Sequence, residues 1–202
     1  FNRKFPNIRL NLEFNLHLDE VCDLLIQGKA DIGITFESLL SRECNAYTLL
    51  SENYLLALPR TEETVLIGSP YSVDGRYRKL QKQDAEIIRK FPMINTYRHE
   101  ERQESLSKFL GTDLKTSNIS ALTLQNRLSF VAQGIGCAIC QEKLVAIETA
   151  KEKCVFLSLD DLFKPQNLVI AWPQNSYTNT AARLFCKEAL SYYRPNCGYS
   201  DV

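Results

Sequence analysis

The sequence lacks an excess of positive charge. Among its 202 residues, 24 Lys and Arg balance 24 Asp and Glu, so the formal net charge is zero. A surface that wraps a phosphate backbone usually carries a basic excess. We therefore expect that this chain does not contact nucleic acid directly.

Long apolar runs are also absent. No stretch approaches the roughly 20 consecutive apolar residues of a membrane-spanning helix. The first residues, FNRKFPNIRL, do not combine a basic patch with the apolar run of a secretory signal. Seven cysteines are an odd number, and their spacing does not suggest a small disulfide-stapled fold. These features favour a cytoplasmic protein with reduced thiols and no membrane partner.

Motifs for catalysis and metal binding are missing as well. The sequence contains no Ser-His-Asp order, paired-carboxylate motif, Gly-rich phosphate loop or HExxH. The two histidines, His17 and His99, lie in polar surroundings typical of surface residues. We expect no catalytic residue, no cofactor and no metal site.

The periodicity of the first 36 residues predicts a strand, a helix and a second strand. Ile8–Phe14 alternates apolar and polar residues, which is typical of a half-buried strand. Leu18–Gln27 has helical spacing and is followed by Gly28 as a stop signal, and Ala30–Phe36 is a short apolar run. A strand, a helix and a strand with short joints favour a parallel sheet.

The rest of the chain continues this alternation. Strands are predicted at Tyr54–Leu58, Phe91–Thr96, Cys137–Cys140, Lys153–Leu159 and Asn167–Trp172. Helices are predicted at Glu100–Leu110, at Leu122–Gln133 and from Asn179 to about Tyr193. The pattern indicates an α/β protein with two lobes.

Five stretches, in this order, resemble the effector-binding domain of LysR-type transcriptional regulators. They are FPNIRLNLEF, LIQGKADIGIT, YLLALPRTEE, VAQGIGCAICQEKLV, and LVIAW followed by NTAARLFCKEAL. The resemblance implies a fold like that of type 2 periplasmic binding proteins. In that fold two Rossmann-like α/β lobes are joined by two crossover strands, and a small effector binds in the cleft between them. Residues 1–59 and 164–202 would form lobe I, and residues 60–163 lobe II.

The chain departs from the family pattern in three places. The family has a strand and most of a helix before FPNI, and a helix-turn-helix domain before those, and neither is present in this sequence. Gln141 replaces a proline that is usual in the family. Two explanations stay open: residues of the first lobe are omitted from this sequence, or the lobe is incomplete. We expect contact with DNA only through an N-terminal domain that this sequence does not contain.

The pair Cys137 and Cys140 invites a metal or redox interpretation. Residues three apart on a strand point to opposite faces, so the two thiols should not converge on one ion. Buried free cysteine behaves as a small hydrophobe, and we expect packing here. Some relatives sense peroxide through a cysteine pair in the second lobe, but the local sequence around that pair is not recognisable here. Gly134 and Gly136 predict a tight turn from helix to strand.

The resemblance places candidate ligand-binding residues near the ends of strands and at helix starts. They are Thr35, Phe36, Asn95, Thr96, Arg98, Ser120, Thr123 and Asn126. Simpler roles stay open: Thr35 as a strand former, Asn95 and Thr123 as helix caps, and Arg98 as a solvated surface charge.

The resemblance implies the effector-sensing domain of a bacterial LysR-type regulator. Such a domain would bind a small anionic metabolite and form homodimers or tetramers. One alternative is a free-standing periplasmic solute-binding protein, which an export signal in the full gene would reveal. The other is a small-acid dehydratase on the same scaffold, which turnover of the ligand would reveal.

Overall fold

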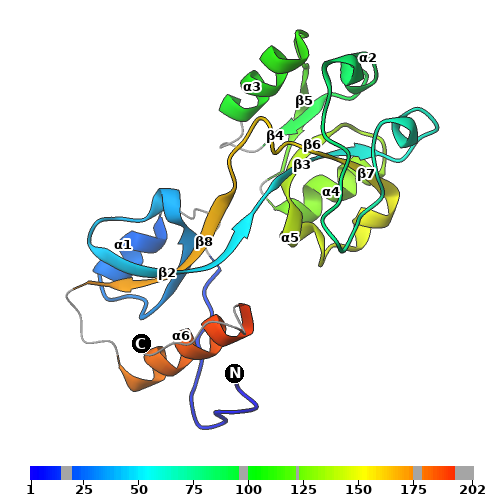
Figure 1. Cartoon of the computed structure of the whole chain (residues 1–202). Helices are drawn as coiled ribbons and strands as arrows, with labels where there is room; N and C mark the ends of the chain where they lie inside the picture. Colours follow the sequence, from blue (N-terminus) through cyan, green and yellow to red (C-terminus); the bar gives the residue numbers. More distant parts are fainter. Residues whose placement is uncertain (15–19, 96–99, 122, 175–178, 194–202) are drawn as a thin grey trace. The chain divides into compact units, whose positions relative to one another are not determined.

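The chain forms two compact units, joined where it crosses between them (Figure 1). A computed structural model describes residues 1–14, 20–95, 100–121, 123–174 and 179–193. The first unit consists of Phe1–Ser51 and Gln166–Val202, and the second of Glu52–Pro165. The strand predicted at Tyr54–Leu58, which the sequence analysis assigned to lobe I, lies in the second unit.

The first unit is built on a three-stranded sheet with a helix on each face. Its elements are α1 (Glu20–Ile26), β1 (Gly33–Phe36), the short helix η1 (Glu37–Leu39), β2 (Cys44–Glu52), β8 (Gln166–Pro173) and α6 (Thr180–Tyr193). The strand order is β1-β8-β2. On β8, Ala171 packs with Leu25 of α1, whereas its neighbour Ile170 packs with Leu190 of α6. Because successive strand residues point to opposite faces, the two helices cover opposite sides of the sheet.

The predicted helix stop after α1 is confirmed. Gly28 has a φ of 68°, and the backbone N–H groups of Gly28 and Lys29 donate to the carbonyls of Leu25 and Leu24 at 3.0 and 2.9 Å. A residue in the left-handed conformation turns the chain so that it bonds the last helical carbonyls. Leu18, where the helix was predicted to begin, lies outside the described residues.

The strand predicted at Ile8–Phe14 is wrong. Residues 1–14 contain turns and irregular chain, and no described strand pairs with them. Leu12 and Phe14, two apolar members of the alternation, are 68% and 88% exposed. Alternation decides which side chains share a face, but a strand also needs a neighbouring backbone to supply its hydrogen bonds.

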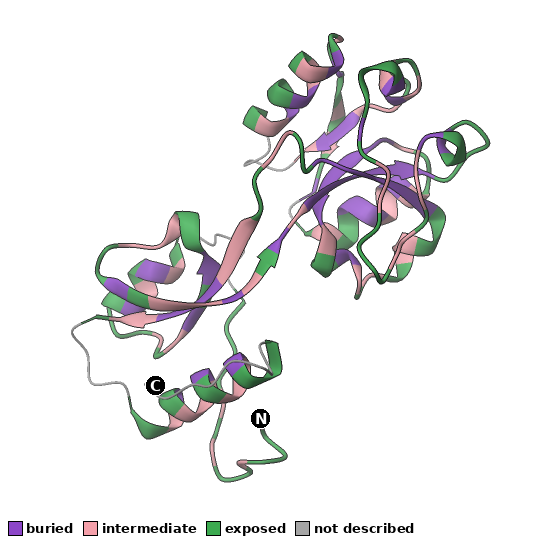
Figure 2. Ribbon diagram, viewed as in Figure 1, coloured by how far each residue is buried: buried purple, intermediate pink, exposed green. Residues whose placement is uncertain are grey.

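The second unit contains an antiparallel sheet and a parallel pair of strands. Its strands are β3 (Tyr54–Pro59), β4 (Met93–Asn95), β5 (Thr116–Ser120), β6 (Ala138–Gln141) and β7 (Cys154–Ser158). Its helices are α2 (Ala85–Ile88), α3 (Glu100–Leu110), α4 (Leu124–Ala132) and α5 (Glu142–Val145), with short helices η2 (Thr64–Leu66), η3 (Lys82–Asp84) and η4 (Thr149–Lys153). All six residues of β3, the central strand of β6-β3-β7, are buried (Figure 2).

The expected parallel sheet is largely wrong. β4 pairs in parallel with β5, and Met93 at its start forms an isolated parallel bridge with Cys137, whereas β1 pairs antiparallel with β8, and β3 pairs antiparallel with β6 and β7. In the first unit the strand–helix–strand argument fails because its first strand does not form. There β1 instead pairs with β8, which comes from the distant end of the chain.

β7 is buried on both faces. Val155 and Leu157 belong to one apolar cluster, and Cys154 and Phe156 to another. Ser158, the one polar residue of the strand, is only 5% exposed. β7 therefore lies between two cores, and both of its faces are covered.

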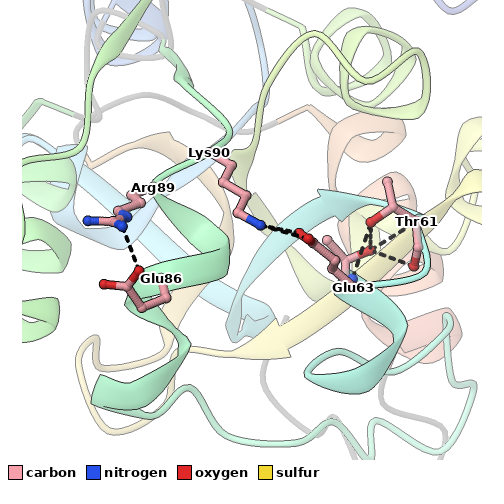
Figure 3. A network of polar contacts seen from close by, with 6 residues as sticks. Thr61, Glu63, Glu86, Arg89 and Lys90 are labelled. Carbon is pink, nitrogen blue, oxygen red and sulfur yellow. Dashed lines mark hydrogen bonds and ion pairs between the residues drawn. The ribbon is translucent and has the colours of Figure 1, made fainter.

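Charged pairs in the second unit differ in burial. The Lys90 ammonium contacts both carboxylate oxygens of Glu63 at 2.7 and 2.6 Å, and both side chains are about half exposed (Figure 3). Asp84, by contrast, is 1% exposed and accepts two hydrogen bonds from the Arg78 guanidinium at 2.7 and 3.0 Å. Exposed pairs add little to stability, whereas a buried carboxylate depends on its partners.

None of the helices in the described ranges has both the length and the apolar character needed to cross a membrane.

Candidate functional site

The carboxyl ends of β4 and β5 bring two predicted site residues together. Asn95, the last residue of β4, is the register partner of Ser120, the last residue of β5. The next residue, Ala121, donates its backbone N–H to the Asn95 carbonyl at 3.0 Å. In open α/β folds, ligands bind beyond the carboxyl ends of parallel strands. This edge is therefore the candidate site within the second unit.

Helix α4 begins at the same edge. Thr123 is its N-cap, with extended backbone angles, and its Oγ1 accepts a 3.2 Å hydrogen bond from the Asn126 backbone N–H. Thr123 thus acts as a helix cap, which was the simpler role left open for it. Asn126 and Ser120 are both exposed. A helix N-terminus carries partial positive charge, which favours an anion beside it.

The Asn95 side chain is fixed from α3. Its Nδ2 donates to the Gln103 Oε1, while its Oδ1 is buried and has no hydrogen-bond partner in the described part of the chain. Among the described residues, the Asn95 side chain therefore does not act as a helix cap, which was the simpler role left open for it. Asn95 instead ties the end of β4 to the second turn of α3.

Two buried polar residues at this edge were missed by the sequence analysis. Gln103 is 9% exposed and Arg127 is 4% exposed, and the Arg127 guanidinium donates to the Ala121 carbonyl at 3.2 Å. Burial lowers the pKa of Arg127 from its ordinary value, and the nearby Cys140 opposes this shift. The signal was available, because Gln103 shares the helical spacing of the buried Leu106 and Leu110.

The other candidates fall elsewhere. Thr35 and Phe36 end β1 in the first unit, where Thr35 is fully buried opposite Val169 in the sheet register and Phe36 is 8% exposed. Thr96 and Arg98 lie outside the described residues. The structure therefore groups four of the eight candidates at one edge of the second unit: Asn95, Ser120, Thr123 and Asn126.

The two cysteines of the CxxC stretch point to opposite faces, as predicted. Cys137 packs with Leu106 and Val155 in one cluster, and Cys140 packs with Leu128 and Phe156 in the other. Burial raises the pKa of the Cys137 thiol to about 12 and raises that of Cys140 as well. Both behave as small core residues. Within the described ranges no three His, Cys, Asp or Glu side chains gather in a way that could hold a metal ion.

The sequence pattern of the family described as LysR substrate binding domain matches residues 1–194. The chain belongs to this family. Domains of this family are the regulatory, effector-binding parts of LysR-type transcriptional regulators, and they are not catalytic modules. The identification made from the five stretches is confirmed. A comparison with curated protein sequences found no match.

Solved structures of LysR-type regulators are similar to this chain. The C-terminal domain of a probable LysR family transcriptional regulator from Rhodococcus sp. RHA1 has a TM-score of 0.68 at 16% identity, covering 93% of this chain and 87% of that one. The CcmR regulatory domain of Synechocystis PCC6803, in complex with 2-PG, has a TM-score of 0.71 at 12% identity, covering 96% and 88%. These likenesses confirm the type 2 periplasmic-binding-protein-like α/β fold.

HinK, a LysR family transcriptional regulator from Pseudomonas aeruginosa, has a TM-score of 0.62 at 18% identity. The match covers 86% of this LysR-family chain but only 56% of the HinK chain. The chain thus spans little more than half of that regulator. LysR-type regulators bind small effectors and act as oligomers on DNA.

Proposed function

We propose that this domain senses a small anionic metabolite at the carboxyl edge of β4 and β5. The observation that carries the proposal is the register pairing of Asn95 with Ser120, beside the Thr123-capped start of α4. Strand ends and a helix start meet there, so backbone N–H groups, an amide and hydroxyls lie close together. Thr35 and Phe36, which end β1 in the first unit, and Thr96 and Arg98, which lie outside the described residues, are not part of this proposed site.

The negative charge of the effector follows from the proposed contacts. The first turn of α4 leaves backbone N–H groups without helical partners, and their dipoles favour an anion. The Synechocystis domain described above binds 2-PG, so a relative of the same fold accommodates a small ligand. An amide and hydroxyls beside a helix start suit a carboxylate better than an apolar ligand.

In the proposed mechanism the effector acts by binding one conformation of the domain more tightly than another. A ligand shifts such an equilibrium only by its difference in affinity for the two states. The shift would pass through contacts between domains of a cytoplasmic homodimer or tetramer to an N-terminal helix-turn-helix domain, which alone would contact DNA. The domain would do this without turning over its ligand.

A thermal-shift screen of the purified chain against amino acids, aromatic acids and dicarboxylates tests the proposal. A ligand present at 100 times its Kd stabilises the folded state by about 2.7 kcal/mol. We expect the shift to fall in Ser120→Ala, which removes one hydroxyl at the edge. The exposed Lys90→Met is the matched control and should keep the full shift.

Two results would contradict the proposal. The first is a shift that Ser120→Ala and Lys90→Met both leave unchanged, because the ligand would then bind elsewhere. The second is chemical conversion of the bound acid, followed by chromatography of the incubated mixture, because the domain would then be an enzyme.

A further inference from the structure

The side-chain amide of Gln103, on α3, is held in a single orientation by two hydrogen-bond acceptors, a carbonyl oxygen and a hydroxyl oxygen. Its Nε2 donates to the Leu114 carbonyl at 2.9 Å and to the Thr116 Oγ1 at 2.9 Å. A carbonyl oxygen cannot donate, so the amide nitrogen of Gln103 must face Leu114. Its oxygen therefore points the other way, toward Asn95.

The orientation of Gln103 in turn fixes that of Asn95. Gln103 Oε1 is an acceptor, so the side-chain group of Asn95 that meets it must be the donor Nδ2. An exchange of the Asn95 nitrogen and oxygen would place two oxygens against each other. The assignment thus rests on the hydrogen-bond chain from Leu114 through Gln103 to Asn95.

The consequence is that Asn95 presents an acceptor, not a donor. Its Oδ1 is buried and receives no hydrogen bond from any described residue. A buried acceptor without a partner is unfavourable, and a group that donates to it gains more than it would at a solvated position. Asn95 is also the register partner of Ser120 at the proposed effector edge.

We infer that the effector is a small acid that also carries a hydroxyl or amino group, and that this group donates a hydrogen bond to Asn95 Oδ1. This inference rests on the proposed function and adds the chemical class of the ligand. Asn95 is the specificity-determining residue, and Gln103 is a positioning residue that acts through it. An acid without a donor would leave the Asn95 oxygen unpaired.

Matched triplets of acids test the inference by isothermal titration calorimetry on the whole chain. The probes are meta-hydroxybenzoate, meta-aminobenzoate and meta-fluorobenzoate, the same para series, and lactate, alanine and the matching fluoropropionate. Fluorine is close in size to a hydroxyl group but cannot donate. We expect a hydroxyl or amino member to bind about tenfold more tightly than its fluoro partner. Whichever of the hydroxyl and amino members binds with the lower Kd identifies the donor group of the effector.

Three variants separate the roles of the residues. Asn95→Leu keeps the size of the side chain and removes the acceptor, so the ratio of the fluoro ligand's Kd to the donor ligand's Kd should fall from about ten to about one. Gln103→Met frees the Asn95 amide to turn and should lower the same ratio. Thr116→Val is the control, because the Leu114 carbonyl still holds Gln103, and it should keep the ratio. A purely structural role of Gln103 would weaken both ligands equally and leave the ratio unchanged.

The outcomes distinguish this inference from the proposed function. Equal affinity for the donor and fluoro members of every triplet that binds would overturn the inference while leaving the proposed function in place. An unchanged ratio in Asn95→Leu would also overturn it. Binding by no member of any triplet would count against the proposed function and, with it, this inference. If Gln103→Met does not fold, as judged by circular dichroism, the ratio of the two Kd values in Asn95→Leu alone decides whether the inference holds.

Discussion

A Cβ atom on Gly136 would lie 2.2 Å from the carbonyl oxygen of Pro92. The same oxygen accepts a hydrogen bond from the Cys137 backbone N–H at 2.9 Å, and the Cys137 carbonyl accepts one from Ile94 at 2.8 Å. The start of β6 and the start of β4 therefore approach too closely for any side chain at position 136. The two glycines of the Gly-Ile-Gly turn have different roles, because Gly134 has open space around it and a φ of 80°.

Gly136→Ala should therefore be much more damaging than Gly134→Ala. At position 136 the new methyl meets backbone, which cannot move without breaking the pairing with β4, and we expect a loss of about 3 kcal/mol. At position 134 the penalty is the left-handed conformation alone, about 1 kcal/mol. Urea unfolding of both variants measures the difference. Equal losses would show that backbone contact is not what selects glycine at position 136.

The six described cysteines should be unreactive in the folded protein. All are buried, and burial raises the pKa of Cys44 and of Cys186 to about 11 and that of Cys154 to about 12. The thiolate is the reactive form, so at neutral pH a disulfide reagent should label these positions only after unfolding. The test is a thiol titration with and without guanidinium in the variant Cys197→Ser, which removes the cysteine outside the described residues. Fast labelling of the native variant would contradict this prediction.

Glu52 should make stability fall as pH rises. Its side chain is 1% exposed, its Oε2 accepts a 2.9 Å hydrogen bond from the Lys143 backbone N–H, and its Oε1 has no partner in the described ranges. Burial raises the pKa of Glu52, Glu142 adds to the shift, and Lys143 opposes it. The folded state thus holds the proton more tightly than the unfolded chain. The contribution is fully present below the unfolded pKa and is lost as pH rises through the folded pKa.

The variant Glu52→Gln tests this dependence. The amide keeps an acceptor for Lys143 but cannot ionise, so we expect the variant to be more stable than the wild type at pH 7 by on the order of 1 kcal/mol. The advantage should shrink toward pH 4. Chemical unfolding at a series of pH values measures both curves, and parallel curves would show that Glu52 titrates alike in the folded and unfolded states.

The two charged pairs of the second unit should respond very differently to neutralisation. Asp84→Asn weakens a buried carboxylate that also accepts the Gln81 backbone N–H at 2.8 Å, and a loss of about 2 kcal/mol is expected. Glu63→Gln removes only the exposed contact with Lys90 and should change stability by less than about 0.5 kcal/mol. Thermal unfolding of the two variants at moderate salt makes the comparison. A larger loss of stability in Glu63→Gln than in Asp84→Asn would show that the exposed pair, and not the buried one, stabilises the fold.

Local periodicity predicted most of the elements. The helix Glu100–Leu110 has the predicted bounds, and the strands near Tyr54, Cys137 and Asn167 were placed to within about two residues. β2 and β5 were missed, because neither Cys44–Glu52 nor Thr116–Ser120 has a regular apolar alternation. Their strand form comes from neighbouring strands and is not visible in their own sequence.

The candidate site was predicted in part. Ser120, Thr123 and Asn126 were named from the loop before a helix, and Asn95 from the end of a strand, and these four lie at one edge of the second unit. Gln103 and Arg127 were not named. Helical spacing places Gln103 on the buried face of α3, but the acceptor that its side chain meets there cannot be read from spacing. Their partners, Leu114 and Ala121, lie 11 and 6 residues away.

The sequence by itself determined the family, the α/β class, the helix stop at Gly28 and the inert packing of Cys137 and Cys140. Each of these depends on the identity and spacing of neighbouring residues. The tertiary structure alone decided that residues 8–14 do not form a strand, that most strands pair antiparallel and that Asn95 presents an oxygen. Pairing and amide orientation depend on which backbone groups from distant parts of the chain meet, and local sequence does not encode them.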